Sequence, residues 1–191
     1  MTTIHPMKLQ LELVAATVEL VDATALLVPV DGQLCRLGGA AAGALRLALP
    51  ADERADELAY VEDELARLRP LPHPQARLID GVARWSKLLV SAAYPHNVDG
   101  VIHTPDDCAR MIRSAIPAAL ALAEAHELPS VAATLIGTAY RMSAELAVRA
   151  FVDGLRAAAA HHVIMRWSLP DPAHRQLAAA AVARVGIPIC G

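Results

Sequence analysis

The sequence is poor in aromatic residues and in long apolar runs, and each shortage excludes a class of function. Phenylalanine, tryptophan and tyrosine make up 3% of its 191 residues, too few for the stacking platforms that hold single-stranded nucleic acids. No stretch reaches the roughly 18–20 consecutive apolar residues of a membrane-spanning helix. The first eight residues lack the apolar run of a signal peptide. The formal net charge of −3 gives no general attraction to phosphate backbones or anionic membranes. We therefore expect a cytoplasmic protein that binds neither a membrane nor nucleic acid.

Cysteine is also scarce. Cys35, Cys108 and Cys190 are an odd, widely spaced set that forms neither a disulfide framework nor a CxxC metal site. We expect them to be reduced thiols. The pair His161-His162 has no carboxylate or cysteine at the spacing of a zinc site. The sequence therefore predicts no metal and no cofactor.

What the chain does contain is enough apolar sequence for one globular domain over residues 1–191, with 55% hydrophobic and 19% charged residues. Alternating or continuously apolar segments predict strands, and segments with helical periodicity or caps predict helices between them. This alternation indicates an α/β domain with a mixed, mostly parallel sheet covered on both sides. The expected strands are 8–14, 24–30, 75–80, 86–93, 130–136 and 163–168, and the expected helices are 38–49, 51–68, 104–126, 143–155 and 172–185.

Glycine-containing loops follow two of the buried strands. The first loop has Gly38, Gly39 and Gly43 at the start of a helix, and the second has Gly137 before the capping residue Ser143. Glycine lets backbone N–H groups approach an anion, and the helix dipole adds attraction. Because ligands of open α/β sheets bind at the carboxyl ends of strands, the two loops together predict a clamp for a diphosphate.

Three segments resemble macro domains, the family that binds ADP-ribose. Residues 16–31 (ATVELVDATALLVPVD) are similar to the opening strand–loop–strand block, residues 38–45 (GGAAAGAL) to the glycine-rich loop, and residues 130–154 (SVAATLIGTAYRMSAELAVRAFVDG) to the second phosphate loop with its strand and helix. The amino-terminal domain of leucyl aminopeptidases, which shares the fold without being catalytic, is also similar. The resemblance implies a three-layer α/β/α fold and a site for ADP-ribose or a related nucleotide. The ligand-binding residues that it implies are Thr17, Asp31, Gly38, Gly39, Gly43, Gly137, Thr138, Ala139, Tyr140 and Arg141.

The chain departs from the family at several of these positions. Thr17 stands where the family has an aspartate that contacts adenine, and Asp31 replaces the asparagine at the distal ribose. Ala42 stands where hydrolytic members have an acidic residue. Tyr140, Arg141 and Met142 are bulky where the second phosphate loop would need small residues. These side chains either fill the diphosphate cleft, or Arg141 supplies charge to a phosphate.

Single polar residues of this region admit two interpretations each. Asp31 is either a general base towards water or a ribose hydroxyl, or a turn residue before Gly32. His96 and His103, in a loop that begins at Tyr94, are either ligand or proton-transfer groups, or ordinary loop residues. Trp85 and Trp167 adjoin strands and are expected in the core or at an interface.

Three hypotheses about function follow. The first, which we favour, is a module that binds ADP-ribose or a related nucleotide derivative without turnover. The second is an ADP-ribosyl hydrolase that uses Asp31 and a bound water, against which the missing acid at Ala42 counts. The third is a scaffold whose cleft is closed and which pairs with another protein or with itself.

Overall fold

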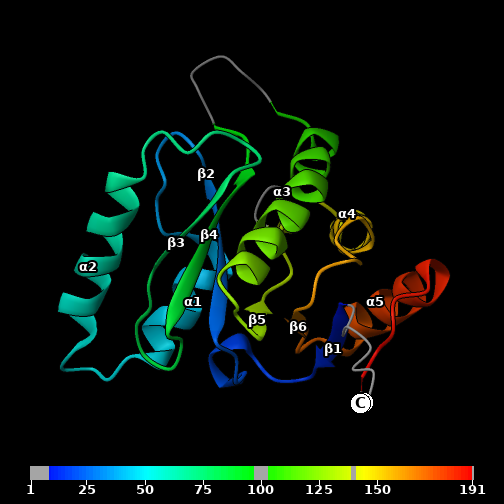
Figure 1. Ribbon diagram of the computed structural model, residues 1–191, viewed down its shortest axis with the longest axis horizontal. Helices are drawn as coiled ribbons and strands as arrows, with labels where there is room; N and C mark the ends of the chain where they lie inside the picture. Colours follow the sequence, from blue (N-terminus) through cyan, green and yellow to red (C-terminus); the bar gives the residue numbers. More distant parts are fainter. Residues whose placement is uncertain (1–8, 97–102, 139–140, 191) are drawn as a thin grey trace, which may run out of the picture.

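Six strands form one sheet in the order β1-β6-β5-β2-β4-β3 (Figure 1). The computed structural model describes residues 9–96, 103–138 and 141–190. Neighbouring strands run parallel except the hairpin pair β3 and β4, which is antiparallel. The predicted mixed, mostly parallel sheet is therefore confirmed. The strands are β1 (Gln10–Val14), β2 (Ala25–Asp31), β3 (Ala76–Asp80), β4 (Lys87–Tyr94), β5 (Ser130–Ala133) and β6 (Ile164–Ser168).

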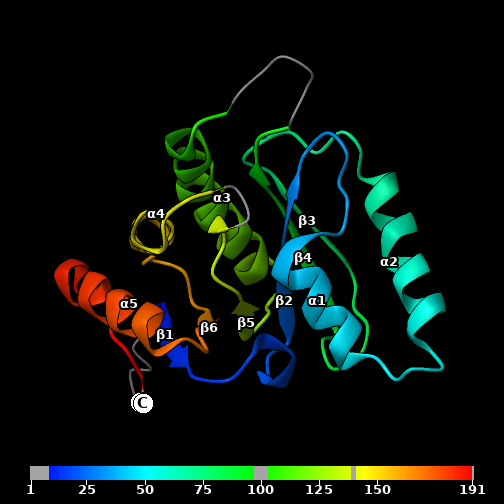
Figure 2. The same cartoon turned by 180° about the vertical axis from the view of Figure 1, so that it is seen from behind.

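Helices cover both faces of this sheet, as Figures 1 and 2 show from opposite sides. Helices α3, α4 and α5 lie on one face, and α1 and α2 on the other. The 3-10 turn η1 (Val18–Leu20) connects β1 to β2. The three-layer α/β/α prediction is confirmed. The helices are α1 (Gly39–Ala48), α2 (Arg54–Arg67), α3 (Pro105–Ala125), α4 (Ala144–Ala157) and α5 (Pro172–Val185).

Strand β5 is shorter than the sequence predicts. Its pairing with β2 is limited to Ala25 and Leu26 of that strand, and it ends at Ala133 rather than at Ile136. Strand β2 continues to Asp31 beside β4 alone. Beyond Ala133 neither β2 nor β6 provides a ladder partner, and the chain leaves the sheet there.

Another boundary also differs from the sequence prediction. Helix α2 begins at Arg54, three residues later than predicted, and residues 51–53 form a turn. Beyond α5 the chain forms a parallel bridge between Ile189 and Leu11, on the edge of β1 away from β6.

The apolar residues form two clusters, one on each face of the sheet. The larger cluster joins α3, α4 and α5 to the sheet and contains Phe151 stacked on Trp167. The second lies between α1, α2 and strands β2 to β4, and includes Trp85. Both tryptophans are core residues, as predicted. Among the described residues the second cluster contains none from β6, so α1 and α2 cover only part of their face.

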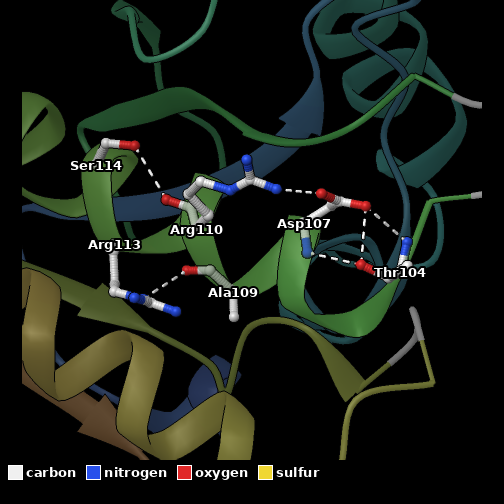
Figure 3. Close-up of polar contacts among 6 residues, drawn as sticks. All are labelled: Thr104, Asp107, Ala109, Arg110, Arg113 and Ser114. Atoms are coloured by element: carbon white, nitrogen blue, oxygen red, sulfur yellow. Dashed lines mark hydrogen bonds and ion pairs between the residues drawn. The ribbon is translucent and has the colours of Figure 1, made fainter.

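Helix α3 begins at a capping box formed by Thr104 and Asp107, shown in Figure 3. The Thr104 hydroxyl accepts from the backbone N–H of Asp107 at 3.2 Å, and the Asp107 carboxylate accepts from the backbone N–H of Thr104 at 2.9 Å. These hydrogen bonds satisfy amides that a helix start leaves unpaired. The hydrogen bond from the backbone of Thr104 is the largest cause that lowers the pKa of Asp107 below its ordinary value.

Replacing Thr104 with alanine is expected to cost about 1 kcal/mol of unfolding free energy at pH 7. The folded-state pKa of Asp107 is lowered, so its contribution is present above the pKa it has in the unfolded chain and is lost as the pH falls through the folded value. Alanine keeps the backbone N–H at this position but removes the hydroxyl, which also donates to Asp107 and lowers its pKa. Part of the difference between wild type and variant should therefore disappear in acid. Urea unfolding at several pH values measures this difference. A gap that is unchanged between pH 7 and pH 3 would contradict the assignment.

No helix in the described part of the chain is long and apolar enough to cross a membrane.

Candidate functional site

A cavity of about 350 Å³ lies where β5 and β6 end, on the face that α1 and η1 share. Figure 2 looks onto this face, with α1 in front of β2. The volume falls in the lower part of the roughly 300–1,000 Å³ range of small-molecule sites. Four segments line it: Thr17, Val18 and Glu19 at η1; Ala40, Gly43, Ala44 and Leu47 of α1; Thr134, Leu135 and Thr138 after β5; and Ser168, Leu169, Pro170 and His174 after β6.

The α1 wall of the cavity is made of three small residues and one leucine at helical spacing. Ala40, Gly43, Ala44 and Leu47 follow the i, i+3, i+4, i+7 pattern that places residues on one face of a helix. A Cβ atom added at Gly43 would meet no heavy atom within 4 Å. The cavity therefore exists because this stripe is small.

Core packing and the contacts of Arg166 hold the η1 wall in place. Val18 and Val21 are buried in the second core cluster. Arg166 of β6 pairs with Glu12 of β1, with 2.8 Å between Nε and Oε2, and donates to the backbone oxygen of Asp22. These contacts fix the β1–β2 connection that carries Thr17 and Glu19.

The polar side chains that line the cavity carry hydroxyls, the Glu19 carboxylate and the His174 imidazole. The Thr17 hydroxyl donates to Glu19 Oε1 at 2.5 Å, and the Ser168 hydroxyl donates to the backbone oxygen of Ala16 at 2.8 Å. Glu19 was missed in the sequence analysis, because an acid beside a connector turn is usually a surface residue. The available signal was its position two residues after Thr17, within one 3-10 turn.

The start of α1 presents free backbone groups. Its N-cap, Gly38, has no side chain to accept a hydrogen bond from the first turn, and that turn contains no acid. Gly38 and Gly39 are exposed. The φ of +63° at Gly39 favours glycine at this position. This geometry suits an anion, which would meet uncapped N–H groups at the positive end of the helix dipole.

The sequence predicts that the loop between β5 and α4 forms a clamp together with the start of α1. The structure describes this loop except for residues 139 and 140. Gly137 has a φ of +110°, and a Cβ there would lie 2.5 Å from the sulfur of Met142. Met142 is a core residue, packed with the helices of the larger cluster. Arg141 is exposed, with a φ of +59° that is costly for a side chain other than glycine. Ala139 and Tyr140 lie outside the described residues.

Ser143 has the predicted capping role at the start of α4. Its hydroxyl accepts from the backbone N–H of Leu146 at 3.2 Å.

Asp31 lies at the end of β2, and its side chain is engaged in the turn that follows. Its Oδ1 accepts from the backbone N–H groups of Gln33 at 3.1 Å and Leu34 at 2.7 Å. His96 Nδ1 is 3.3 Å from the same oxygen, without hydrogen-bond geometry. These hydrogen bonds agree with the turn interpretation of Asp31, and its role as a general base stays a prediction. Ala42 of α1 is buried. Helix α1 contains no acidic residue that could act together with Asp31.

Two further side chains near this turn are His103 and Cys35. His103 Nε2 lies 2.9 Å from the backbone oxygen of His96, which joins the two ends of a loop whose residues 97–102 are outside the described part. Cys35 is buried and has a φ of +44°, and burial raises the pKa of its thiol. A low reactivity of this thiol follows.

Of the residues that the resemblance implies, Thr17, Gly43 and Thr138 line the cavity. They come from three separate segments. Asp31, Gly38, Gly39, Gly137 and Arg141 are not among its lining residues. The structure adds Glu19, Thr134, Ser168 and His174 as polar residues of the cavity, none of which the sequence singled out.

The described residues contain no group of three or more histidines, cysteines or acids that could hold a metal ion. The three cysteines are free thiols.

Solved structures of macrodomains are similar to this chain over nearly its whole length. The Oceanobacillus iheyensis macrodomain with MES bound has a TM-score of 0.69 at 15% identity, covering 92% of this chain and 91% of that one. The same macrodomain with ADP has a TM-score of 0.69 at 14% identity, covering 92% and 90%. The Trypanosoma brucei macrodomain in complex with ADP-ribose has a TM-score of 0.64 at 18% identity, covering 90% and 68%.

No protein-family model and no curated protein sequence matches this chain. The similarity is therefore one of architecture, at sequence identities too low to carry residue roles. Strand order, helix layers and the superposition over nine-tenths of the chain agree with each other. The protein has the macrodomain fold, in a divergent sequence.

Proposed function

We propose that this protein is a module that binds ADP-ribose or a related nucleotide derivative and does not turn it over. The observation that carries the proposal is the convergence of Thr17, Gly43 and Thr138 on one cavity at the carboxyl ends of β5 and β6. Ligands of open α/β sheets bind at this edge. The presence of ADP-ribose or ADP in structures with the same fold supports this ligand class.

The cavity suits the base of such a ligand. Leu135, Leu169 and Pro170 supply apolar walls opposite Ala44 and Leu47, and these walls suit the faces of a planar ring. Thr17 carries no charge where the family has an aspartate, but Glu19 brings a carboxylate to the same wall. An ionised carboxylate accepts hydrogen bonds only, so it favours an amino group on the base.

The phosphates would lie at the start of α1 and against the loop after β5. The uncapped first turn of α1 at Gly38 and Gly39 offers backbone N–H groups. We propose the backbone of residues 137–140 as the second half of this clamp, with the exposed Arg141 as its cation. Both groups favour a diphosphate over a neutral linker.

The surroundings of Asp31 support binding without turnover. One oxygen of its carboxylate already accepts two backbone hydrogen bonds of the turn. Ala42 supplies no second acid. A hydrolase would need Asp31 to activate a water while it holds this turn, so we place Asp31 beside the distal ribose as an acceptor.

Calorimetric titration with ADP-ribose tests the proposal. Wild-type protein should bind, and ligand at a hundred times the dissociation constant should raise the unfolding free energy by about 2.7 kcal/mol. For a domain of this size the midpoint should rise by roughly 5–10 °C. An absence of both effects would overturn the proposal and favour the scaffold, whose oligomeric state gel filtration would then measure.

The same preparation separates binding from hydrolysis. We expect no release of ADP-ribose from an ADP-ribosylated protein, in wild type or in Asp31→Asn. The asparagine keeps an acceptor oxygen for the turn but cannot serve as a base. Release by wild type that Asp31→Asn abolishes would establish the hydrolase instead.

A further inference from the structure

Helix α5 is an outer helix whose solvent side is largely apolar. It lies at one end of the molecule beyond α4, as Figures 1 and 2 show, and its inner side packs in the larger core cluster. The apolar residues at its exposed positions are Ala173, Leu177, Ala180 and Ala183, and Leu177 is 38% exposed. A helix that is apolar on all sides is normally a covered one.

Helix α2 shows how an outer helix of this protein looks when it faces water. Its exposed positions include Asp56, Asp63 and Arg67. Within α5, all of which the structure describes, Arg184 is the one charged residue at an exposed position. The outer face of α5 therefore has the composition of a contact surface.

Four exposed residues form a stripe along α5, which we call the α5 stripe. Ala173, Leu177, Ala180 and Arg184 follow the i, i+4, i+7, i+11 spacing, which is the a and d spacing of helices that pack side by side. The two alanines are small enough for a second helix to approach closely. A groove of about 200 Å³ between α4 and α5 includes Leu177 and Arg184 among its lining residues. The stripe and the groove edge together suit a docked helix.

The two ends of the α5 stripe carry opposite charges. Asp171 stands at the amino-terminal end, with a side chain that is 52% exposed. Its Oδ1 accepts from the backbone N–H of Ala173 at 2.8 Å, and its Oδ2 lies 3.8 Å from His174 Nε2. Arg184 stands at the carboxyl-terminal end. Its Nε donates to the backbone oxygen of Ala180 at 3.2 Å, and it forms no ion pair within the described part of the chain.

This charge pattern makes the α5 stripe complementary to a copy of itself. When two such helices lie antiparallel, Arg184 of each copy lies beside the first turn of the other, near its Asp171. A two-fold axis generates both contacts at once, because the same surface is used on each side. A parallel pair would instead place like charges next to each other.

We propose that the α5 stripe pairs two copies of this chain, with the two α5 helices antiparallel about a two-fold axis. Leu177 of each copy packs against Ala180 of the other, and Arg184 of each copy faces Asp171 of the other. The contact is confined to one helix and the groove edge beside it, so the dimer is weak, with a dissociation constant in the micromolar range. The pairing does not depend on nucleotide binding.

Sedimentation velocity at protein concentrations up to about 0.5 mM, well above a micromolar dissociation constant, tests the proposal. Wild type should pass from monomer to dimer as the concentration rises. Leu177→Glu should weaken the association by about a hundredfold or more, because it places a carboxylate in the centre of the contact. A wild type that stays monomeric at the highest concentration would overturn the proposal. A dimer that Leu177→Glu leaves unchanged would overturn its assignment to α5.

The sign of the effect of Asp171→Ser tests the antiparallel arrangement. Serine keeps an N-cap acceptor for the helix and removes the charge. In the wild-type background this change should weaken the dimer a few-fold, because Arg184 loses its partner. In the background of Arg184→Glu, which alone should weaken the dimer about tenfold or more, it should strengthen the dimer, because a repulsion is removed. A strengthening by Asp171→Ser alone would show that the helices are not antiparallel.

Leu20→Glu is the matched control. Leu20 is 63% exposed and lies on η1, outside the α5 stripe, so this variant should dimerise as wild type does. Leu177→Glu and Arg184→Glu should keep the circular dichroism spectrum and the ADP-ribose affinity of wild type, since neither residue lines the cavity. A wild type that dimerises without binding ADP-ribose would overturn the proposed function and support this inference.

Discussion

Replacing Phe151 with alanine is expected to lower the free energy of unfolding by about 3–5 kcal/mol. Phe151 is the chain's single phenylalanine and is fully buried. Its ring stacks on Trp167 with 4.3 Å between centroids and 16° between planes, which joins α4 to β6 across the larger core cluster. The alanine variant loses both the transfer energy of the ring and the packing around the space it leaves. Urea unfolding followed by far-ultraviolet circular dichroism measures the loss.

The conservative variant at this position separates ring contacts from volume. Phe151→Leu should cost less than about 1.5 kcal/mol if volume dominates, and more if the stacking on Trp167 contributes. Leu177→Ala, a change at a partly exposed position of α5, should stay within about 0.5 kcal/mol. A loss below 1.5 kcal/mol for Phe151→Ala would show that α4 does not pack on β6 as described.

Replacing Gly43 with phenylalanine should abolish nucleotide binding while the protein remains folded. A side chain there extends from α1 into the cavity and meets open space at its Cβ. A phenyl ring would occupy much of the roughly 350 Å³ that the base needs. We expect ADP-ribose affinity to fall by about a hundredfold or more, equivalent to about 2.7 kcal/mol. Calorimetric titration checks the affinity.

Gly43→Ala is the control for the helix itself. Alanine in a helix interior is favoured over glycine by about 0.5–1 kcal/mol, so this variant should unfold at a higher urea concentration than wild type. Its single methyl group leaves most of the cavity open, so its ADP-ribose affinity should stay within a few-fold of wild type. If Gly43→Phe binds as wild type does, the base lies elsewhere and the proposed orientation of the ligand is wrong.

Much of the fold could be predicted because its signals are local. Helix α5 runs from Pro172 to Val185 as predicted, since Asp171 caps it and Gly186 ends it with a φ of +70°. Thr104 and Ser143 are likewise capping residues. The end of β5 was not predictable in this way. Residues 134–136 read as a continuation of the strand, but they have no pairing partner on β2 or on β6 and therefore lie outside the sheet.

The candidate site could be predicted only in part, because most of its residues come together through the fold and carry no local signal. Thr17, Gly43 and Thr138 stand in segments whose order resembles a known family, so their convergence could be expected. Glu19, Thr134 and His174 carry no local signal that distinguishes them from surface or strand-end residues. Their importance comes from four segments that meet in space. Asp31 was assigned two roles, and hydrogen bonds within its own turn, which the sequence does not show, support the structural one.

The incomplete cover that α1 and α2 give their face of the sheet has a consequence for how this protein can change. Most residues around the cavity, among them Thr17, Glu19, Gly43, Thr134 and His174, belong to neither core cluster. Substitutions there should alter ligand preference at little expense to folding. Substitutions at the cavity are therefore compatible with an unchanged architecture. Such a chain can acquire a new small-molecule specificity without first acquiring a more stable fold.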